Sequence, residues 1–234
     1  MDLILYVAFF VALIFSMYAQ FKVSSTFNKY SRVPTARGRC ASDAARMILN
    51  SNGLSDVRVE RVGGALTDHF DPRSNTLRLS DAVYASNSAA AVGVAAHEAG
   101  HAIQHGVGYV PIIIRSKLVP VTNFASRISW LVILGGLILS MLNPATTLGY
   151  YLILTGIGLF STSALFQLVT LPCEFNASRR AMAELRASGW YTEDELRASR
   201  KVLTAAALTY VAALFVSVIQ VLRLLLVFGR RRNK

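Results

Sequence analysis

Cysteine and acidic side chains are both scarce in this chain of 234 residues. Its two cysteines, Cys40 and Cys173, are too few for a disulfide framework, and we expect both to stay reduced, with Cys173 packing as a small apolar group. Only 13 acidic residues accompany 24 lysines and arginines, which gives a formal net charge of +11. Basic motifs interleaved with aromatic residues, which would indicate a nucleic-acid partner, are missing. We therefore interpret the basic excess as flanks of membrane segments that set topology and contact anionic lipid.

Charge is also missing from three long stretches, although charged residues make up 16% of the chain and apolar residues 53%. A helix needs roughly 20 apolar residues to cross a bilayer. The stretches that reach this length are residues 3–21, 128–166 and 202–222. The sequence therefore predicts an integral membrane protein.

The first stretch is predicted to be a retained anchor, because Asp2 precedes it without any lysine or arginine, unlike the start of a cleaved signal peptide. The second is too long for one crossing, and we expect a hairpin of residues 129–142 and 148–170 that turns at residues 143–145. This makes four crossings. The last crossing is the hardest to place. With the N-terminus outside, four crossings would put the basic tail at residues 230–234 outside the cell, against the positive-inside rule.

The residues that carry chemistry form the motif His97-Glu98-Ala99-Gly100-His101. Its alanine-rich surroundings predict a helix, on which positions i and i+4 share one face, so both imidazoles can bind one metal ion. Glu98 can then accept a proton from a metal-bound water. If four histidines and six glutamates were placed at random in a chain of this length, the expected number of such motifs would be on the order of 10⁻³. Two core histidines that happen to be four residues apart are the alternative.

A zinc site needs a third protein ligand. His105 extends the spacing, but eight residues along a helix cover about 12 Å, too far for one ion with ligand bonds near 2 Å. The carboxylates that follow His101 are Glu174, Glu184, Glu193, Asp194 and Glu195. The last three fit a capping box at a helix start, and Glu184 fits a solvated face among arginines. Glu174 remains, just past Pro172 and expected in the first turn of a helix that runs to about residue 188.

Topology supports Glu174 independently. The predicted hairpin between His101 and Glu174 has two crossings, so both residues lie on the same side of the membrane. The chain leaves the bilayer just before Pro172, which places the site at the membrane surface.

Upstream of the motif, alternating apolar and charged residues predict strands at 57–62 and 76–79, and residues 41–49 predict a short helix capped by Ser42 or Asp43. One edge of such a small sheet could pair with an extended peptide.

Further polar side chains are candidates for assisting the site. His69, His105 or Arg179 could donate a hydrogen bond to a developing oxyanion, and Asp68, His69 or Asp71 could orient a ligand. A structural role is the alternative for the three donors, and turn chemistry is the alternative for the three groups that could orient a ligand.

Three segments together resemble those of the YugP-type bacterial membrane zinc metallopeptidases. They are residues 97–105 (HEAGHAIQH), residues 68–80 (with DHFDPR and LRLS) and residues 171–180 (LPCEFNASRR). The order of motif, hairpin and glutamate is also similar to the HtpX and CAAX prenyl protease group, in which E-x-x-x-D places an acid where this chain has Ser178. A serine hydroxyl can orient a ligand but brings no charge.

The resemblance implies a zinc-dependent endopeptidase of the gluzincin type. One Zn²⁺ per chain would be bound by His97, His101 and Glu174, with Glu98 as the general base. The expected partners are a protein or peptide substrate, such as a membrane-associated or misfolded protein, and the lipid bilayer. A regulatory membrane partner or a homo-oligomer stays an open alternative.

The predicted fold is mainly α: a polytopic membrane protein with about four transmembrane helices and a small α+β zincin-like domain that carries the motif on a helix. Its expected parts are an N-terminal anchor (1–22), a metallopeptidase domain (23–118), a transmembrane hairpin (119–171), a third-ligand helix with its connecting segment (172–201), and a last transmembrane helix with a basic tail (202–234). We expect the cytoplasmic (inner) membrane as its location, with the active site facing the cytoplasm.

Two other classes stay open. A site-2-type intramembrane protease carries its motif in a spanning helix, which the apolar run 89–114 permits, but the Asp-Gly ligand pair of that class is missing downstream. A catalytically silent zinc-binding scaffold would keep the ligands without the reaction.

Overall fold

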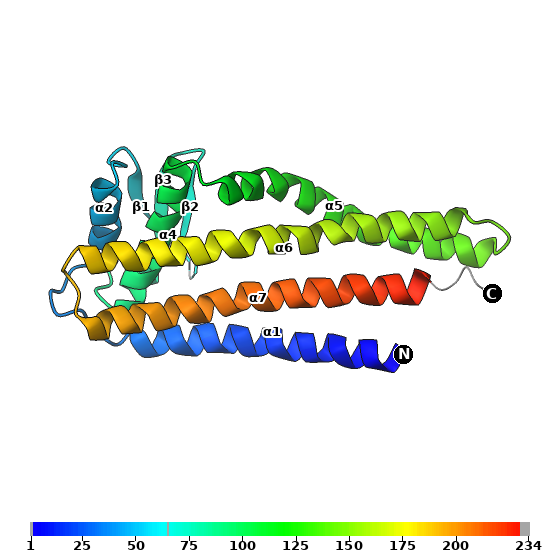
Figure 1. The fold of residues 1–234 in the computed structure, drawn as a ribbon, viewed down its shortest axis with the longest axis horizontal. Coiled ribbons are helices and arrows are strands. Elements are labelled where there is room, and N and C mark those ends of the chain that lie inside the picture. Colours follow the sequence, from blue (N-terminus) through cyan, green and yellow to red (C-terminus); the bar gives the residue numbers. More distant parts are fainter. Residues whose placement is uncertain (1, 65, 230–234) are drawn as a thin grey trace. The chain divides into compact units, whose positions relative to one another are not determined.

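The computed structural model describes residues 2–64 and 66–229 (Figure 1). The described chain is mainly helical and contains one small sheet. Its elements are α1 (Asp2–Tyr30), α2 (Ala41–Ser51), β1 (Arg58–Val62), β2 (His69–Asp71), β3 (Thr76–Ser80), α3 (Asp81–Tyr84), α4 (Ala89–Gly106), α5 (Val110–Leu142), α6 (Leu148–Ala187) and α7 (Glu193–Gly229). The predicted fold class is confirmed. The basic tail at residues 230–234 lies outside the described residues.

Within the described residues, four helices are long and apolar enough to cross a membrane: α1, α5, α6 and α7. The predicted hairpin corresponds to α5 and α6, whose turn falls between Leu142 and Leu148. The 40 residues of α6 measure about 60 Å, twice the roughly 30 Å of a bilayer core, so this helix extends well beyond one crossing. The apolar run 89–114 is not one helix, because α4 ends at Gly106 and α5 begins at Val110.

The predicted start of a helix at Pro172 is wrong. Pro172 lies inside α6, which continues without a break from Leu148 to Ala187. A proline removes one backbone hydrogen bond at a cost of roughly 3 kcal/mol, and helical residues on both sides can outweigh this. Membrane helices contain proline more often than soluble ones, because neighbouring helices, Ser and Thr side chains and ordered waters can satisfy the freed backbone groups.

The chain divides into two compact units. The first, which we call the span unit, comprises Met1–Tyr18, Ile114–Thr170 and Tyr210–Lys234. The second, which we call the site unit, comprises Ala19–Ile113 and Leu171–Thr209. All the residues singled out from the sequence for chemistry belong to the site unit.

In the span unit, the two arms of the hairpin approach each other through small residues. A Cβ atom added to Gly136 would lie 2.7 Å from the carbonyl oxygen of Gly149, so a larger residue there would push the helices apart. Ile133, Ile153 and Ile157 are buried beside this contact. Many large apolar side chains of α5 and α6 are otherwise exposed, among them Leu131, Leu134 and Leu165, as expected of a surface that faces lipid.

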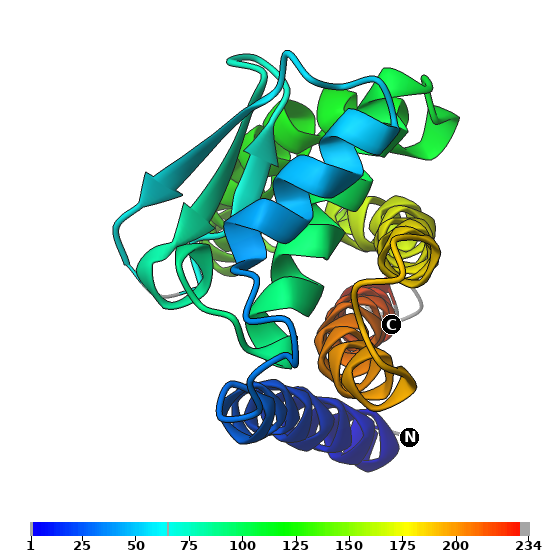
Figure 2. The ribbon, with the colours of Figure 1, turned by 90° about the vertical axis from the view of Figure 1, so that its left-hand side faces the viewer.

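In the site unit, the sheet has the order β1-β3-β2, with β1 parallel and β2 antiparallel to β3. Figure 2 shows this sheet beside α2, which crosses α4. Leu77 and Leu79 of the central strand join Ile48 and Leu49 of α2 in a core in which all four are fully buried. The two predicted strands are confirmed as β1 and β3, whereas β2 was missed because three residues are too short for a periodic pattern.

The predicted helix at 41–49 is confirmed as α2, but its predicted caps are wrong. Cys40 is the N-cap, and the carboxylate of Asp43, three residues on, accepts hydrogen bonds from the Cys40 backbone N–H (3.2 Å) and thiol (3.1 Å). Asp43 therefore takes the glutamate's place in a capping box. The helix ends at Ser51, Asn52 is its C-cap, and Gly53 follows with a φ of 70°.

Candidate metal centre

Ser88 is the N-cap of the motif helix α4, and its hydroxyl accepts a hydrogen bond from the backbone N–H of Ala91 (3.2 Å). Alanines at positions 91, 95, 99 and 102 are fully or almost fully buried in the core of the site unit. His97 and His101 lie one turn apart, with ring centroids separated by 4.7 Å. Because these small residues pack one face of α4 against the core, both imidazoles lie on the far side of the helix from that face.

Glycine at position 100 allows α6 to approach this face. A Cβ atom at Gly100 would lie only 2.5 Å from the carbonyl oxygen of Ala177 in α6. Ala177 is three residues beyond Glu174, so both lie on the same side of α6. The close approach of the two backbones therefore brings the Glu174 carboxylate to the histidines.

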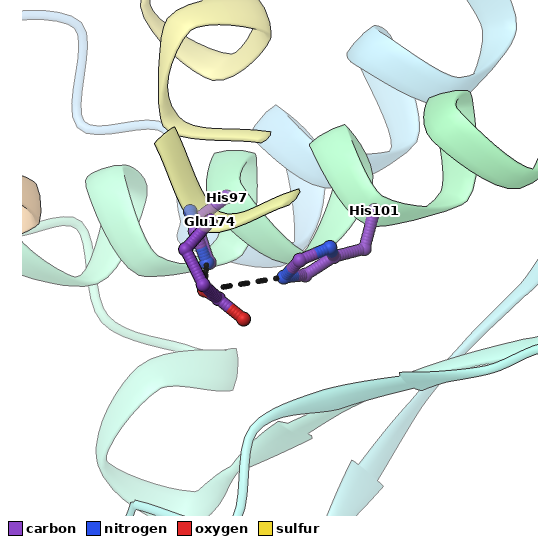
Figure 3. Close-up of side chains that lie close together, drawn as sticks. All are labelled: His97, His101 and Glu174. Atoms are coloured by element: carbon purple, nitrogen blue, oxygen red, sulfur yellow. Dashed lines mark hydrogen bonds and ion pairs between the residues drawn. The ribbon is translucent and has the colours of Figure 1, made fainter. Parts of the chain in front are cut away.

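The three predicted ligands converge in the structure. Figure 3 shows the imidazoles of His97 and His101 reaching from α4 toward the Glu174 carboxylate on α6. Glu174 Oε2 lies 3.1 Å from His97 Nε2 and 3.6 Å from His101 Nε2. One ligand atom from each residue falls within 4.8 Å of the others. Glu174 itself is only 1% exposed.

This donor set fits zinc. A tetrahedral ion with bonds of about 2.0–2.1 Å separates its ligand atoms by roughly 3.3 Å, and the two observed nitrogen–oxygen distances lie on either side of that value. Two histidines and one glutamate are also a ligand set of catalytic zinc sites, which keep the fourth position for water or substrate.

Glu174 lies beyond residue 170, where the predicted membrane crossing and the span unit both end, in the part of α6 that belongs to the site unit. Burial raises the pKa of this carboxyl, but hydrogen bonds from His101 and His97, and their charges, outweigh burial and leave the pKa well below its ordinary value. The ionised form that binds a metal is therefore favoured.

The second ring nitrogen of each histidine also has a partner. His101 Nδ1 lies 3.0 Å from Gln104 Oε1, and His97 Nδ1 lies 3.1 Å from Ser178 Oγ. Ser178 is among the residues that the sequence predicted to orient a ligand, whereas Gln104 is not. Its spacing of three from His101 on a helix is the signal that could have identified it.

Glu98 follows His97 on α4 and is half-buried. Within the described part of the chain, its carboxylate makes no hydrogen bond and no ion pair, which leaves it available to accept a proton.

The remaining candidates lie outside the three-residue group. His69, at the start of β2, is exposed, and its Nδ1 lies 2.7 Å from the carbonyl oxygen of Thr67. The ring of His105 packs against Phe70 with centroids 5.6 Å apart. Arg179 is exposed on α6.

The two aspartates make the contacts expected of turn chemistry. Asp68 accepts hydrogen bonds from the backbone N–H (2.7 Å) and the hydroxyl (2.9 Å) of Ser80. Asp71 accepts them from the Ser74 hydroxyl (2.7 Å) and the Arg73 N–H (3.0 Å). Both carboxylates thus stabilise the connections of β2 and β3.

The carboxylates excluded as ligands have other partners. Glu184 accepts a hydrogen bond from the Ser51 hydroxyl at 3.2 Å. Glu195 and Thr192 form the predicted capping box, with Thr192 N–H to Glu195 Oε2 at 2.8 Å and Glu195 N–H to Thr192 Oγ1 at 3.3 Å. Glu193 pairs with Arg186 at 2.9 Å.

Sequence comparison places these features in a known class. The family described as "Putative neutral zinc metallopeptidase" matches residues 5–229, almost the whole chain. The chain belongs to this family and is therefore a zinc metallopeptidase by class. Among individual proteins, it is similar to "Putative membrane protease YugP" of Bacillus subtilis (strain 168), with 49% identity over 224 residues that cover 95% of this chain and 96% of that protein. No solved structure matches the chain. The resemblance inferred from the three motifs is confirmed.

Proposed function

We propose that the protein is a membrane-embedded zinc endopeptidase whose ion is held by His97, His101 and Glu174. The observation that carries this proposal is the approach of one buried carboxylate oxygen to both Nε2 atoms, at 3.1 and 3.6 Å. Zinc bound there would lower the pKa of a water toward neutrality and polarise the carbonyl of the scissile peptide.

Glu98 serves as the general base and acid of the reaction. Its carboxylate accepts a proton from the attacking water and then gives it to the leaving amine. The position of Glu98 next to His97, and its freedom from ion pairs among the described residues, support this role. A catalytically silent scaffold would have no use for such an unengaged carboxylate beside the ligands.

The substrates we propose are membrane-associated or misfolded proteins, which expose extended peptide. In the site unit, β2 is an outer strand of the sheet and lies against α4, which carries the motif. Extended segments can bind by adding a strand to such an edge. All four candidate spans continue directly into the site unit, so the enzyme is proposed to work at the membrane surface.

The site-2-type alternative loses its main support in the fold. It needs the motif in a spanning helix, but α4 is not among the candidate spans found in the described residues. Its alanines are instead buried in the core of the site unit.

The test is substitution of Glu98 by glutamine, which preserves shape and removes the basic carboxylate. We expect Glu98→Gln to retain zinc and to lose about 10²–10⁴-fold in the rate of casein hydrolysis. Metal content is measured on the same preparations, with His97→Ala as the control that loses both zinc and activity. A Glu98→Gln protein that cleaves at the wild-type rate would eliminate Glu98 as the base.

A further inference from the structure

Gln104 is a fully buried amide that touches both ligand-bearing helices. On α4, its Oε1 lies 3.0 Å from His101 Nδ1. Toward α6, its Nε2 donates to the carbonyl oxygen of Cys173 (2.7 Å) and to Asn176 Oδ1 (3.0 Å). Burying an amide is costly unless it is hydrogen-bonded, and here both ends are engaged.

The orientation of this amide follows from its partners. The carbonyl oxygen of Cys173 can only accept a hydrogen bond, so the NH₂ group of Gln104 must face α6. The oxygen of Gln104 must then face His101, and an amide oxygen also only accepts. His101 must therefore donate from Nδ1, so Nε2, which lies 3.6 Å from Glu174 Oε2, is the ring nitrogen that can give up its proton and bind a metal.

The side-chain amide of Asn176 is oriented by its partners in the same way. Asn176 Oδ1 accepts from Gln104 Nε2 and also from Arg180 Nε, at 2.8 Å. A guanidinium can only donate, so Arg180 keeps the Asn176 oxygen turned toward Gln104. Each group in the chain from Arg180 to His101 thus has one allowed orientation.

His97 is held differently. Its Nδ1 contacts the hydroxyl of Ser178, which can either donate or accept. That contact leaves the tautomer of His97 open, whereas Gln104 settles that of His101. Gln104 is also bonded to the residue directly before Glu174, so one side chain orients one ligand and ties down the turn that carries another.

We infer that Gln104 is a positioning residue for the metal centre: it holds His101 in the Nδ1–H form and ties α4 to the Cys173–Glu174 turn of α6. This inference rests on the proposed function, because it assumes that His101 and Glu174 bind zinc. Its consequence is a loss of zinc affinity when Gln104 is replaced, since groups that orient metal ligands typically contribute 10–100-fold to metal affinity.

The test compares zinc affinities of purified full-length variants in detergent, by competition with a chromophoric chelator. We expect Gln104→Leu to bind zinc about 10–100-fold more weakly than wild type. Gln104→Glu keeps an oxygen acceptor for His101 Nδ1–H, so its affinity should lie between those of Gln104→Leu and wild type. The absorption spectrum of bound Co²⁺ should change in Gln104→Leu, because His101 is free to turn.

Ser199→Ala is the matched control. It removes another buried hydrogen bond on α4, from the Ser199 hydroxyl to the Ala89 carbonyl oxygen (2.7 Å), two turns away from the ligands. Ser199→Ala should lower the melting temperature and leave zinc affinity unchanged. If Ser199→Ala weakens zinc binding as much as Gln104→Leu does, Gln104 acts only through stability and the inference fails.

Further outcomes separate the inference from the proposed function. Wild-type zinc affinity in Gln104→Leu, with loss in His101→Ala and Glu174→Ala, overturns the inference alone. Undiminished zinc binding in His101→Ala and Glu174→Ala overturns the proposed zinc site itself. Should Gln104→Leu not fold, Asn176→Leu removes only the outer link of the chain and should give a smaller loss of affinity; an unchanged affinity in that variant also counts against the inference.

Discussion

At the scale of single residues, the candidate metal centre depends on a carboxylate held almost entirely out of water. Glu174 is 1% exposed, and such burial of a charge is unfavourable unless partners compensate for it. His97 and His101 supply that compensation through the contacts described above. Bound zinc would supply more, since the ion carries two positive charges.

Replacement of this carboxylate is the most direct test of the ligand set. Glu174→Ala should lower zinc content and abolish peptidase activity, because two histidines alone hold zinc weakly. Glu184→Ala, on the same helix and bonded to Ser51, should retain both. Metal analysis of these variants, together with His69→Ala, identifies the third ligand. Full zinc content in Glu174→Ala, with loss of zinc in Glu184→Ala or His69→Ala, would mean that the third ligand is misassigned.

Asp71 permits a prediction about pH. Hydrogen bonds from the Ser74 hydroxyl and the Arg73 N–H lower the pKa of Asp71 to about 2, against the effect of burial and with a further contribution from Arg78. The folded state therefore binds this proton more weakly than the unfolded state, whose carboxyl titrates near pH 3.9. The stabilisation is complete above pH 3.9 and disappears as the pH falls toward 2.

The measurement is the difference in melting temperature between wild type and Asp71→Asn in detergent. At pH 6, wild type should have the higher melting temperature, and its free energy of unfolding should be larger by on the order of 1 kcal/mol, the contribution of a typical hydrogen bond. The difference should shrink below pH 4. A difference of the same size at pH 6 and at pH 2.5 would show that the charge of Asp71 does not contribute.

At the scale of elements, the candidate metal centre is a product of how closely α4 and α6 pack. Small residues form the contact: Gly100 on α4 lies against the backbone of Ala177, and Gly93, two turns earlier, lies against Ser199 of α7. An added Cβ would come within 2.5 Å at the first contact and 3.1 Å at the second. The motif helix is therefore held by glycine contacts on two sides.

Gly100→Ala should separate α4 from α6 and weaken zinc binding. Alanine normally favours a helix over glycine by roughly 1 kcal/mol, but insertion of a methyl group against a backbone oxygen costs about 1–3 kcal/mol. We therefore expect a lower melting temperature and a lower zinc content. Gly158→Ala is the matched control, because nothing lies within 4 Å of the added Cβ; it should be neutral or stabilising. A Gly100→Ala protein with wild-type zinc affinity would contradict the packing account.

At the scale of the whole molecule, the expected membrane topology and the candidate metal centre constrain each other. His101 and Glu174 are separated in sequence by α5 and most of the apolar part of α6. Their side chains can meet only if these helices cross the bilayer an even number of times together. The observed convergence is consistent with the hairpin.

Cysteine-accessibility labelling checks this topology. In a background without Cys40 and Cys173, we expect cysteines at Ser55 and at Ser188 to react from the same side, the cytoplasm. If the two positions react from opposite sides of the membrane, Glu174 cannot reach the histidines and the proposed site is wrong. If both react from outside, the proposed site still holds, but it faces the outside of the cell and not the cytoplasm. A cysteine at Asn233, outside the described residues, would report on which side the tail lies.

The sequence by itself determined those features that depend on neighbours along the chain. The helical spacing of His97 and His101, the lengths of the apolar stretches and the capping box at Thr192 are all local patterns. Glu174 was reached by elimination, because the chain has so few carboxylates after the motif.

The tertiary structure alone decided which side chains support the ligands. The local spacing places Gln104 beside His101 but does not show that Gln104 also contacts α6, and it does not distinguish Gly100 from any other small residue. Their roles arise from contacts with Cys173 and Ala177, some seventy residues away in sequence, and such contacts exist only once α4 and α6 have packed. α6 also continues through Pro172, where local rules predicted a helix start. Short-range propensity specifies the elements, but hydrogen bonds and close contacts between distant segments specify the site, because they depend on the distance between backbones and not on the order of residues.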